Sequence, residues 1–225
     1  GFPSHPHRGI ETVTYMLAGE FEHKDSTGGE GRMTAGDVQW MKTGSGIIHS
    51  EMPAMKEGKL HGFQLWINMP ASLKMSKPEY HYIDANEMSI HHDEDKKIKV
   101  IAGKFENAEG PIKKHNVEPI FFDVELKQNK QFSFSIPKSH NSFVYLVDGR
   151  IKIGNLSHDN IEGSKLVLLT NGNNLKVFAE TNAKFLLIAG EPIGERIARG
   201  GPFVMNTKSE IIQAINDYNN GTFVR

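Results

Sequence analysis

The sequence has no cysteine among its 225 residues. It therefore excludes a disulfide framework, a zinc or iron–sulfur centre with thiolate ligands, and a thiol nucleophile. Any metal would have to be held by histidine, aspartate or glutamate. Because the chain contains 11 histidines, their positions are the first clue to a functional site.

An excess of charge and long apolar runs are also absent. The 26 basic and 27 acidic residues give a net charge of -1, which provides no global field for nucleic acid or an anionic membrane. No uninterrupted apolar stretch approaches the roughly 20 residues of a membrane span. We therefore expect a soluble protein with no direct nucleic-acid partner and no membrane partner, and the absence of cysteine fits a cytoplasmic location.

The length suggests two domains, because domains usually contain about 100–150 residues. The chain begins with Gly1 rather than Met, directly before a cluster of His, Pro and Gly. We expect that residues preceding Gly1 are missing from this sequence. The absence of a signal peptide therefore says little about targeting.

Short segments rich in Val, Ile, Phe, Tyr and Thr alternate with turn-forming residues at intervals of about 8–12 positions, which is typical of an all-β sandwich or barrel. The predicted strands of the first half are 11–17, 20–24, 37–41, 46–51 and 60–68. Those of the second half are 97–102, 120–126, 131–136, 142–147, 150–154, 165–169, 175–178 and 184–189.

Two segments depart from this rhythm. The polar stretch 84–97 is interpreted as a solvated linker, and its histidine pair, His91 and His92, as exposed loop residues. Near the end, Thr207 and Glu210 have the spacing of a capping box. The apolar residues Ile211, Ile215 and Tyr218 follow at helical intervals, so we expect a helix that docks one apolar face.

The first chemical motif is His5-Pro6-His7. Side chains two positions apart on a strand point to the same face, so this pair directs two imidazoles at one point. Proline disfavours a helical conformation of the residue before it and suits an edge strand. The motif is short, and exposed histidines on an edge strand are the alternative interpretation.

The second motif is His49-Ser50-Glu51, which offers one imidazole and one carboxylate on a predicted strand. If the two strands pair across a barrel, three imidazoles and one carboxylate converge with one or two coordination positions left open. Such donors suit Fe(II), Mn(II), Ni(II) or Zn(II), with iron the first choice for oxygen chemistry. The alternative is that Glu51 pairs with a lysine such as Lys42 or Lys56.

Two further residues are candidates for lesser roles. Glu11 shares strand parity with His5 and His7 if the segment is continuous, so it is a reserve ligand, with a structural ion pair or a supporting contact preferred. His61 is in phase with Phe63, so we expect it to face inward as a core histidine or part of a pocket wall.

Together these segments resemble the pirin family of the cupin superfamily. The resemblance covers nearly the whole chain and rests on the segments 1–15, 35–41, 46–53, 187–192 and 200–207. It implies a bicupin, with two double-stranded β-helix (jelly-roll) barrels face to face and a short C-terminal helix. The implied domains are an N-terminal metal-binding barrel with a truncated start over 1–95, a C-terminal barrel without a metal set over 96–205, and a helix and tail over 206–225.

The family's ligand pattern of H-x-H on one strand and H-x-E on a later one maps onto His5, His7, His49 and Glu51. The resemblance implies one iron per chain. General cupins carry their carboxylate where Glu11 stands, which keeps that residue in reserve. No H-x-H occurs in the second half of the chain, so no second metal is expected.

The resemblance implies an Fe(II)-dependent dioxygenase that cleaves a flavonol such as quercetin. We add the hypothesis that Glu51 is the proton acceptor when it leaves or loosens its coordination. The expected apolar wall of its pocket comprises Val13, Tyr15, Phe63, Leu65 and Trp66, although Trp66 has the opposite strand parity. The alternative is an iron-dependent redox sensor that binds a transcription factor or a metabolic enzyme. A metal-free scaffold for a sugar or a protein is a third possibility. A monomer is expected in each case.

Overall fold

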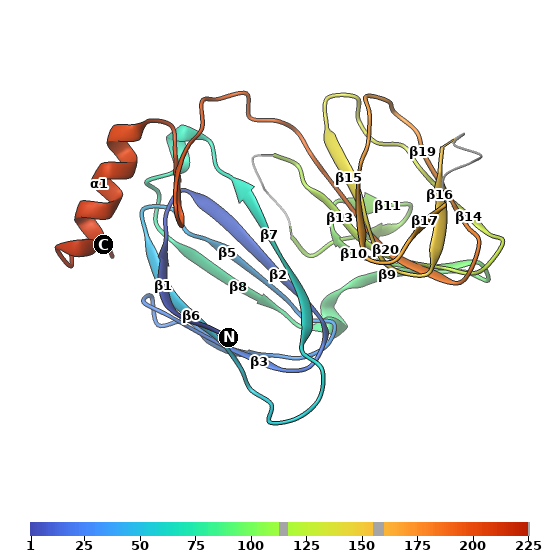
Figure 1. Ribbon diagram of the computed structural model, residues 1–225, viewed down its shortest axis with the longest axis horizontal. Helices are drawn as coiled ribbons and strands as arrows, with labels where there is room; N and C mark the ends of the chain where they lie inside the picture. The colour runs from blue at the N-terminus through green and yellow to red at the C-terminus, as the bar shows by residue number, and fades with distance from the viewer. Residues whose placement is uncertain (113–116, 155–159, 225) are drawn as a thin grey trace. The chain divides into compact units, whose positions relative to one another are not determined.

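The computed structural model describes residues 1–112, 117–154 and 160–224, and these form two compact units (Figure 1). Unit 1 comprises residues 1–86 and 193–225, and unit 2 comprises residues 87–192. Strands dominate both units, which confirms the all-β expectation. This division into two compact units does not test the predicted three-part domain organisation, which remains a prediction.

Unit 1 is built from two antiparallel four-stranded sheets. The first sheet has the order β1-β6-β3-β4 and contains β1 (Phe2–His7), β6 (Ile47–Pro53), β3 (Phe21–Asp25) and β4 (Glu30–Met33). The second has the order β7-β2-β5-β8 and contains β7 (His61–Asn68), β2 (Ile10–Ala18), β5 (Val38–Lys42) and β8 (Glu79–Ile83). Of these strands, β4 and β8 were not predicted. A short 3-10 helix (Ala71–Leu73) connects β7 with β8.

The inner face of the second sheet is polar, which corrects the predicted pocket wall. Thr14 pairs in register with Gln64 and Gln39, so these three side chains share a face. Thr14 and Gln64 bond to Glu51 of the first sheet. The predicted wall residues other than Trp66 lie on the opposite face: Val13, Tyr15, Phe63 and Leu65.

A glycine at the end of β1 shifts the strand parity and removes Glu11 from the site. Gly9 has φ of 80°, and a Cβ there would lie 2.1 Å from the carbonyl oxygen of Val204. Only glycine fits this backbone conformation and this close approach. The chain turns between β1 and β2, and Glu11 accepts a hydrogen bond of 2.7 Å from Trp40 Nε1 on the face away from Gln64.

Unit 2 contains a six-stranded sheet, a four-stranded sheet and a hairpin. The large sheet has the order β18 (Lys165–Leu168), β15 (Asn141–Asp148), β20 (Ala183–Gly190), β13 (Ile120–Leu126), β10 (Lys96–Ala102) and β9 (Ser89–His92). The smaller sheet has the order β14 (Gln131–Phe134), β19 (Leu175–Ala179), β16 (Arg150–Ile153) and β17 (Ile161–Glu162). The hairpin joins β11 (Lys104–Phe105) and β12 (Ala108–Glu109).

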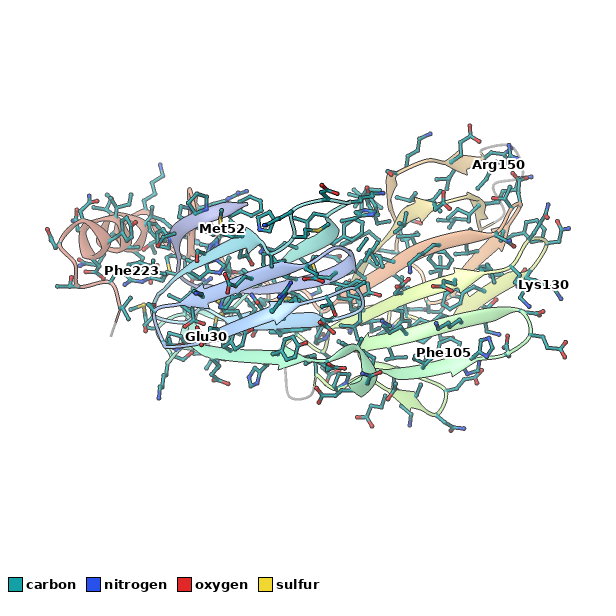
Figure 2. All side chains as sticks on the ribbon, turned by 90° about the horizontal axis from the view of Figure 1, so that it is seen from below. Glu30, Met52, Phe105, Lys130, Arg150 and Phe223 are labelled. Atoms are coloured by element: carbon teal, nitrogen blue, oxygen red, sulfur yellow. The ribbon has the colours of Figure 1, made fainter. Side chains whose placement is uncertain are left out.

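The core of unit 2 is apolar. Phe105, Phe122, Phe132 and Phe185 are buried in one hydrophobic cluster, and Figure 2 labels the first of them. Unit 1 also buries apolar side chains, but it encloses a cluster of buried histidines and carboxylates as well. A cluster of titratable groups that could bind metal is found only in unit 1 among the residues described.

The segment predicted as a solvated linker instead begins unit 2. Residues 85–87 form a 3-10 helix, and β9 pairs with β10 along the edge of the large sheet. His91 is half-buried against the Phe105 ring and lies 3.2 Å from Glu106. The linker interpretation was wrong because antiparallel pairing can hold a polar sequence in a strand at a sheet edge.

The C-terminal segment packs within unit 1. It forms the hairpin β21 (Ala198–Gly200) and β22 (Phe203–Met205), then helix α1 (Lys208–Asn219). The capping box is confirmed, because the Thr207 side chain accepts from the Glu210 amide while the Glu210 carboxylate accepts from the Thr207 amide. The described helices include none long and apolar enough to cross a membrane.

The docking face of α1 differs from the prediction. Ile211 is buried, as expected, but Ile215 and Tyr218 are at least 40% exposed. Asp217 is buried in their place because its carboxylate lies 2.7 Å from the guanidinium of buried Arg8. The same guanidinium lies over the ring of Phe223, which is labelled near α1 in Figure 2.

Candidate metal centre

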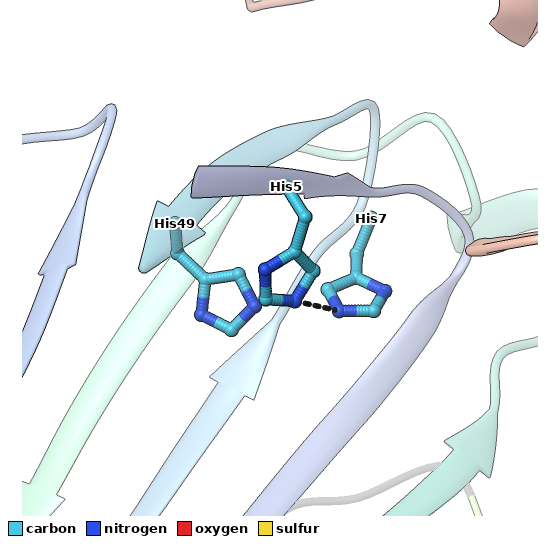
Figure 3. A group of neighbouring side chains, drawn as sticks. All are labelled: His5, His7 and His49. Atoms are coloured by element: carbon cyan, nitrogen blue, oxygen red, sulfur yellow. Dashed lines mark hydrogen bonds between the residues drawn. The ribbon is translucent and has the colours of Figure 1, made fainter. Parts of the chain in front are cut away.

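Three histidines from two neighbouring strands meet on the inner face of unit 1. His5 on β1 is the register partner of His49 on β6, and His7 follows on the same face of β1 (Figure 3). One ring nitrogen from each of the three lies within 4.8 Å of the others. His5 is half-buried, whereas His7 and His49 are buried.

The hydrogen bonds of His5 and His7 determine which nitrogen of each ring carries the proton. Nδ1 of His5 lies 2.8 Å from the carbonyl oxygen of Pro3, and Nδ1 of His7 lies 3.3 Å from that of Pro202. A carbonyl oxygen only accepts, so both Nδ1 atoms must be protonated. In the neutral rings both Nε2 atoms are then bare acceptors.

These two bare nitrogens are only 3.0 Å apart (Figure 3). Two lone pairs at this distance repel each other unless a proton or a cation lies between them. Metal-ligating histidines characteristically donate their second N–H to a backbone carbonyl or carboxylate, as His5 and His7 do here. The donor arrangement therefore fits a metal ion.

His49 provides a second independent sign. Both of its ring nitrogens are buried without a hydrogen-bond partner among the described residues. Burial lowers the pKa of His49 to about 2, with His5, His7 and His23 adding electrostatic repulsion of the charged form. Burial likewise lowers the pKa of His7 to about 4. Both rings are thus neutral near pH 7, as metal coordination requires.

Glu51 is held beside the histidines by a side chain from β7. Gln64 Nε2 lies 3.0 and 2.9 Å from the two carboxylate oxygens of Glu51. Trp66 Nε1 donates to Gln64 Oε1 over 3.1 Å, which fixes the orientation of the Gln64 amide. Burial raises the pKa of Glu51, although the hydrogen bonds from Gln64 oppose the rise. Lys42 is not its partner, because Lys42 bonds to Glu79.

A second group of ligand atoms, from His23, His49 and Glu51, also lies within 4.8 Å. His23, however, has both nitrogens engaged. Its Nε2 donates to Asp25 over 2.9 Å, and Gln39 Nε2 donates to its Nδ1 over 3.1 Å. The grouping of His5, His7 and His49 therefore fits a metal better than the grouping that includes His23.

His23 was not predicted as a site residue. The residue is fully buried, and its ring stacks on Tyr80 at a centroid distance of 4.7 Å. The sequence did indicate an inward-facing position for His23. Phe21, His23 and Asp25 occupy alternate positions of one strand and therefore share a face, and the apolar residue Phe21 is buried. His115 and His158 lie outside the described residues.

The remaining predicted site residues lie elsewhere, with one exception. His61 is half-buried with its ring 5.5 Å from Phe63, and it is not part of either metal-binding group. Trp66, whose strand parity pointed away from the predicted wall, lies beside the site. Its ring is perpendicular to that of His7 at a centroid distance of 5.1 Å.

Two protein-family models match separate parts of the chain. The model of the Pirin family matches residues 1–67, and the model of the Pirin C-terminal cupin domain matches residues 121–224. The chain is 42% identical over 225 residues to a pirin-like protein of Caulobacter vibrioides, with 99% of this chain and 80% of that protein covered.

Two solved structures extend the comparison. The fold matches a quercetin 2,3-dioxygenase from Acinetobacter baumannii with a TM-score of 0.91 and 38% identity, over 98% of this chain and 78% of that one. It also matches the bacterial pirin YhhW from Escherichia coli in complex with nickel(II), with a TM-score of 0.67 and 23% identity, over 85% and 76% of the two chains. The chain is thus a bicupin that belongs to the pirin family.

Proposed function

We propose that this pirin binds one Fe(II) through His5, His7, His49 and Glu51 and acts as a dioxygenase on a flavonol such as quercetin. The observation that carries the proposal is the convergence of three imidazoles, in which the Nε2 atoms of His5 and His7 lie 3.0 Å apart and both nitrogens of buried His49 have no hydrogen-bond partner among the described residues. Imidazole and carboxylate donors suit Fe(II), and also Mn(II), Ni(II) and Zn(II). The nickel complex of the E. coli pirin makes nickel the first alternative to test.

The bound metal would supply a template for substrate and dioxygen and would stabilise developing negative charge. In this proposal Glu51 would loosen its coordination and accept the proton of the flavonol hydroxyl; the raised pKa of its buried carboxyl supports this role because it favours the protonated product. Gln64 holds both oxygens of that carboxylate in place. The proposed outcome is addition of O₂ and opening of the heterocycle with loss of carbon monoxide.

The open border of the site favours an enzyme over a sealed sensor. Gln64 and Trp66 are exposed to solvent, yet they contact Glu51 and His7. Phe2 is 65% exposed, and its ring lies 6.4 Å from that of His5. Aromatic surface beside polar groups that converge on one point is the usual character of a small-molecule site.

The test is oxygen uptake with quercetin by protein purified without oxygen and loaded with Fe(II). We expect stoichiometric consumption of O₂ and quercetin with release of carbon monoxide. Protein loaded with Ni(II), Mn(II) or Zn(II) identifies the metal that supports the fastest turnover. If metal binds but quercetin and related flavonols consume no oxygen, the dioxygenase proposal fails and the iron-dependent sensor takes its place.

A further inference from the structure

A tryptophan and an arginine form a pair at the border of the candidate metal centre. The guanidinium carbon of Arg199, on β21, lies 5.3 Å from the centroid of the Trp66 ring on β7. Trp66 in turn contacts His7 and donates to Gln64. Arg199 is therefore one indole ring away from the proposed metal ligands. This arginine was not among the predicted site residues.

Both members of the pair are held in place by surrounding structure. The hairpin that carries Arg199 places its Pro202 carbonyl against His7 Nδ1, and Val204 N donates to the carbonyl of Arg8 over 3.1 Å. The indole is fixed by its N–H bond to Gln64. A guanidinium stacked on an anchored indole is already ordered, so a ligand that binds it has less side-chain entropy to offset.

The charge of Arg199 is not neutralised within the described part of the chain. No carboxylate there lies within ion-pair distance of its guanidinium, and the side chain is exposed. The carboxylates nearer the site are engaged elsewhere, Glu51 by Gln64 and Asp25 by His23 and Thr27. By contrast, buried Arg8 has Asp217 as a counter-ion.

We propose that Arg199 and Trp66 form the recognition site for a planar aromatic anion, with Arg199 binding its negative group. A guanidinium offers parallel N–H donors that match the two oxygens of a carboxylate or the vicinal oxygens of a deprotonated catechol or enol. The part of the indole that remains exposed provides apolar surface beside this charge for the aromatic ring of the ligand. This inference rests on the proposed function in that it assigns the substrate class to the same site.

The test compares 2-naphthoate, a planar anion, with 2-naphthamide, its neutral isostere, by calorimetric titration. The protein is used as purified and again after treatment with a chelator. We expect wild-type protein to prefer the anion by about tenfold in Kd in both forms, and Arg199→Met to abolish this preference. Arg196→Met is the matched control, because Arg196 is an exposed arginine of the same segment.

Arg199→Lys keeps the positive charge but removes the planar guanidinium. We therefore expect this variant to retain only part of the wild-type preference for the anion. The inference is overturned if wild-type protein binds the anion no better than the amide, or if the preference survives in Arg199→Met. Neither probe is oxidised in this measurement. Failure here with normal quercetin turnover would therefore reject the arginine site alone, whereas retained anion preference without turnover would reject the dioxygenase.

Discussion

At the scale of single residues, protonation states account for the candidate site. Two histidines give their Nδ1 protons to backbone carbonyls, and His49 is left with two unpartnered nitrogens. A buried polar atom without a partner costs free energy, which coordination of a metal would recover. The short separation of the His5 and His7 Nε2 atoms has the same explanation.

Gln64 is expected to position Glu51 for metal binding. Replacing Gln64 with Leu removes both hydrogen bonds to the carboxylate. We expect metal affinity to fall about 10–100-fold, the usual cost of losing a partner of a metal ligand. Competition with a chromophoric chelator measures this affinity. Gln128→Leu, at an exposed turn of unit 2, should leave it unchanged, and equal affinities for wild type and Gln64→Leu would contradict this role.

The neutral state of His49 predicts how stability depends on pH. Its pKa is near 2 in the folded protein and near 6.5 when unfolded, so between these values the unfolded chain binds the additional proton. The free energy of unfolding of metal-free protein should therefore decrease as pH falls below 6.5. His49→Gln should reduce that slope by about 1.4 kcal/mol per pH unit. Urea unfolding from pH 7 to pH 4 tests this, and parallel curves would refute it.

At the scale of the secondary-structure elements, the site depends on the chain's two ends. β1 supplies two histidines, and β22 and α1 hold the following turn through Val204 and Asp217. Breaking a buried ion pair by removing one partner leaves an uncompensated charge. The Arg8–Asp217 pair is thus a structural link between α1 and the strand of the H-x-H motif.

A double-mutant cycle tests this link. Arg8→Met or Asp217→Leu alone should lower the free energy of unfolding by about 3–5 kcal/mol. The double variant should lose clearly less than the two single losses together, because neither charge is then left unpaired. Chemical denaturation of all four proteins gives the coupling. Additive losses would show that the two residues stabilise the fold independently.

The two short motifs could be predicted from sequence because strand periodicity is local. Two residues on one strand, such as His5 and His7, share a face whatever the rest of the chain does. The contribution of Gln64 could not be predicted in this way, since it depends on the register of β7 against β2 and on the packing of one sheet against another. Nothing in the local sequence specifies that register.

The wrongly predicted pocket wall has a different cause. Residues 10–16 of β2 are buried on both faces, so Thr14 and Val13 are both buried. Hydrophobicity identifies the inner face of a strand only when the other face is in water. The alternation of residues along the strand correctly separated its two faces. The error was to assign the apolar face to the site, which is lined by the polar face.

At the scale of the whole molecule, the two units differ in the polar groups that they bury. Unit 1 encloses histidines, carboxylates and amides, whereas unit 2 encloses a phenylalanine cluster. The sequence predicted a metal set only in the first half, because the second half has no H-x-H motif, and it did not predict how either interior is packed. The structure adds its physical counterpart, since the apolar core of unit 2 is filled by its own side chains.

Metal binding should consequently stabilise one unit more than the other. A ligand that binds only the folded site stabilises by about 2.7 kcal/mol at 100 times its Kd. Hydrogen exchange of the most protected amides in residues 1–86 should slow by up to about 100-fold when metal is added, with little change in 87–192. Equal slowing in β13 of unit 2 would show that the metal acts on the molecule as a whole.

The most direct test of the account is the metal content of protein purified without oxygen. We expect about one transition-metal ion per chain in wild type and in His81→Ala, a control at an exposed histidine of unit 1. His49→Ala should contain almost none, because it removes the ligand with two unpartnered nitrogens. Wild-type protein without transition metal, or equal metal content in His49→Ala, would contradict the central claim.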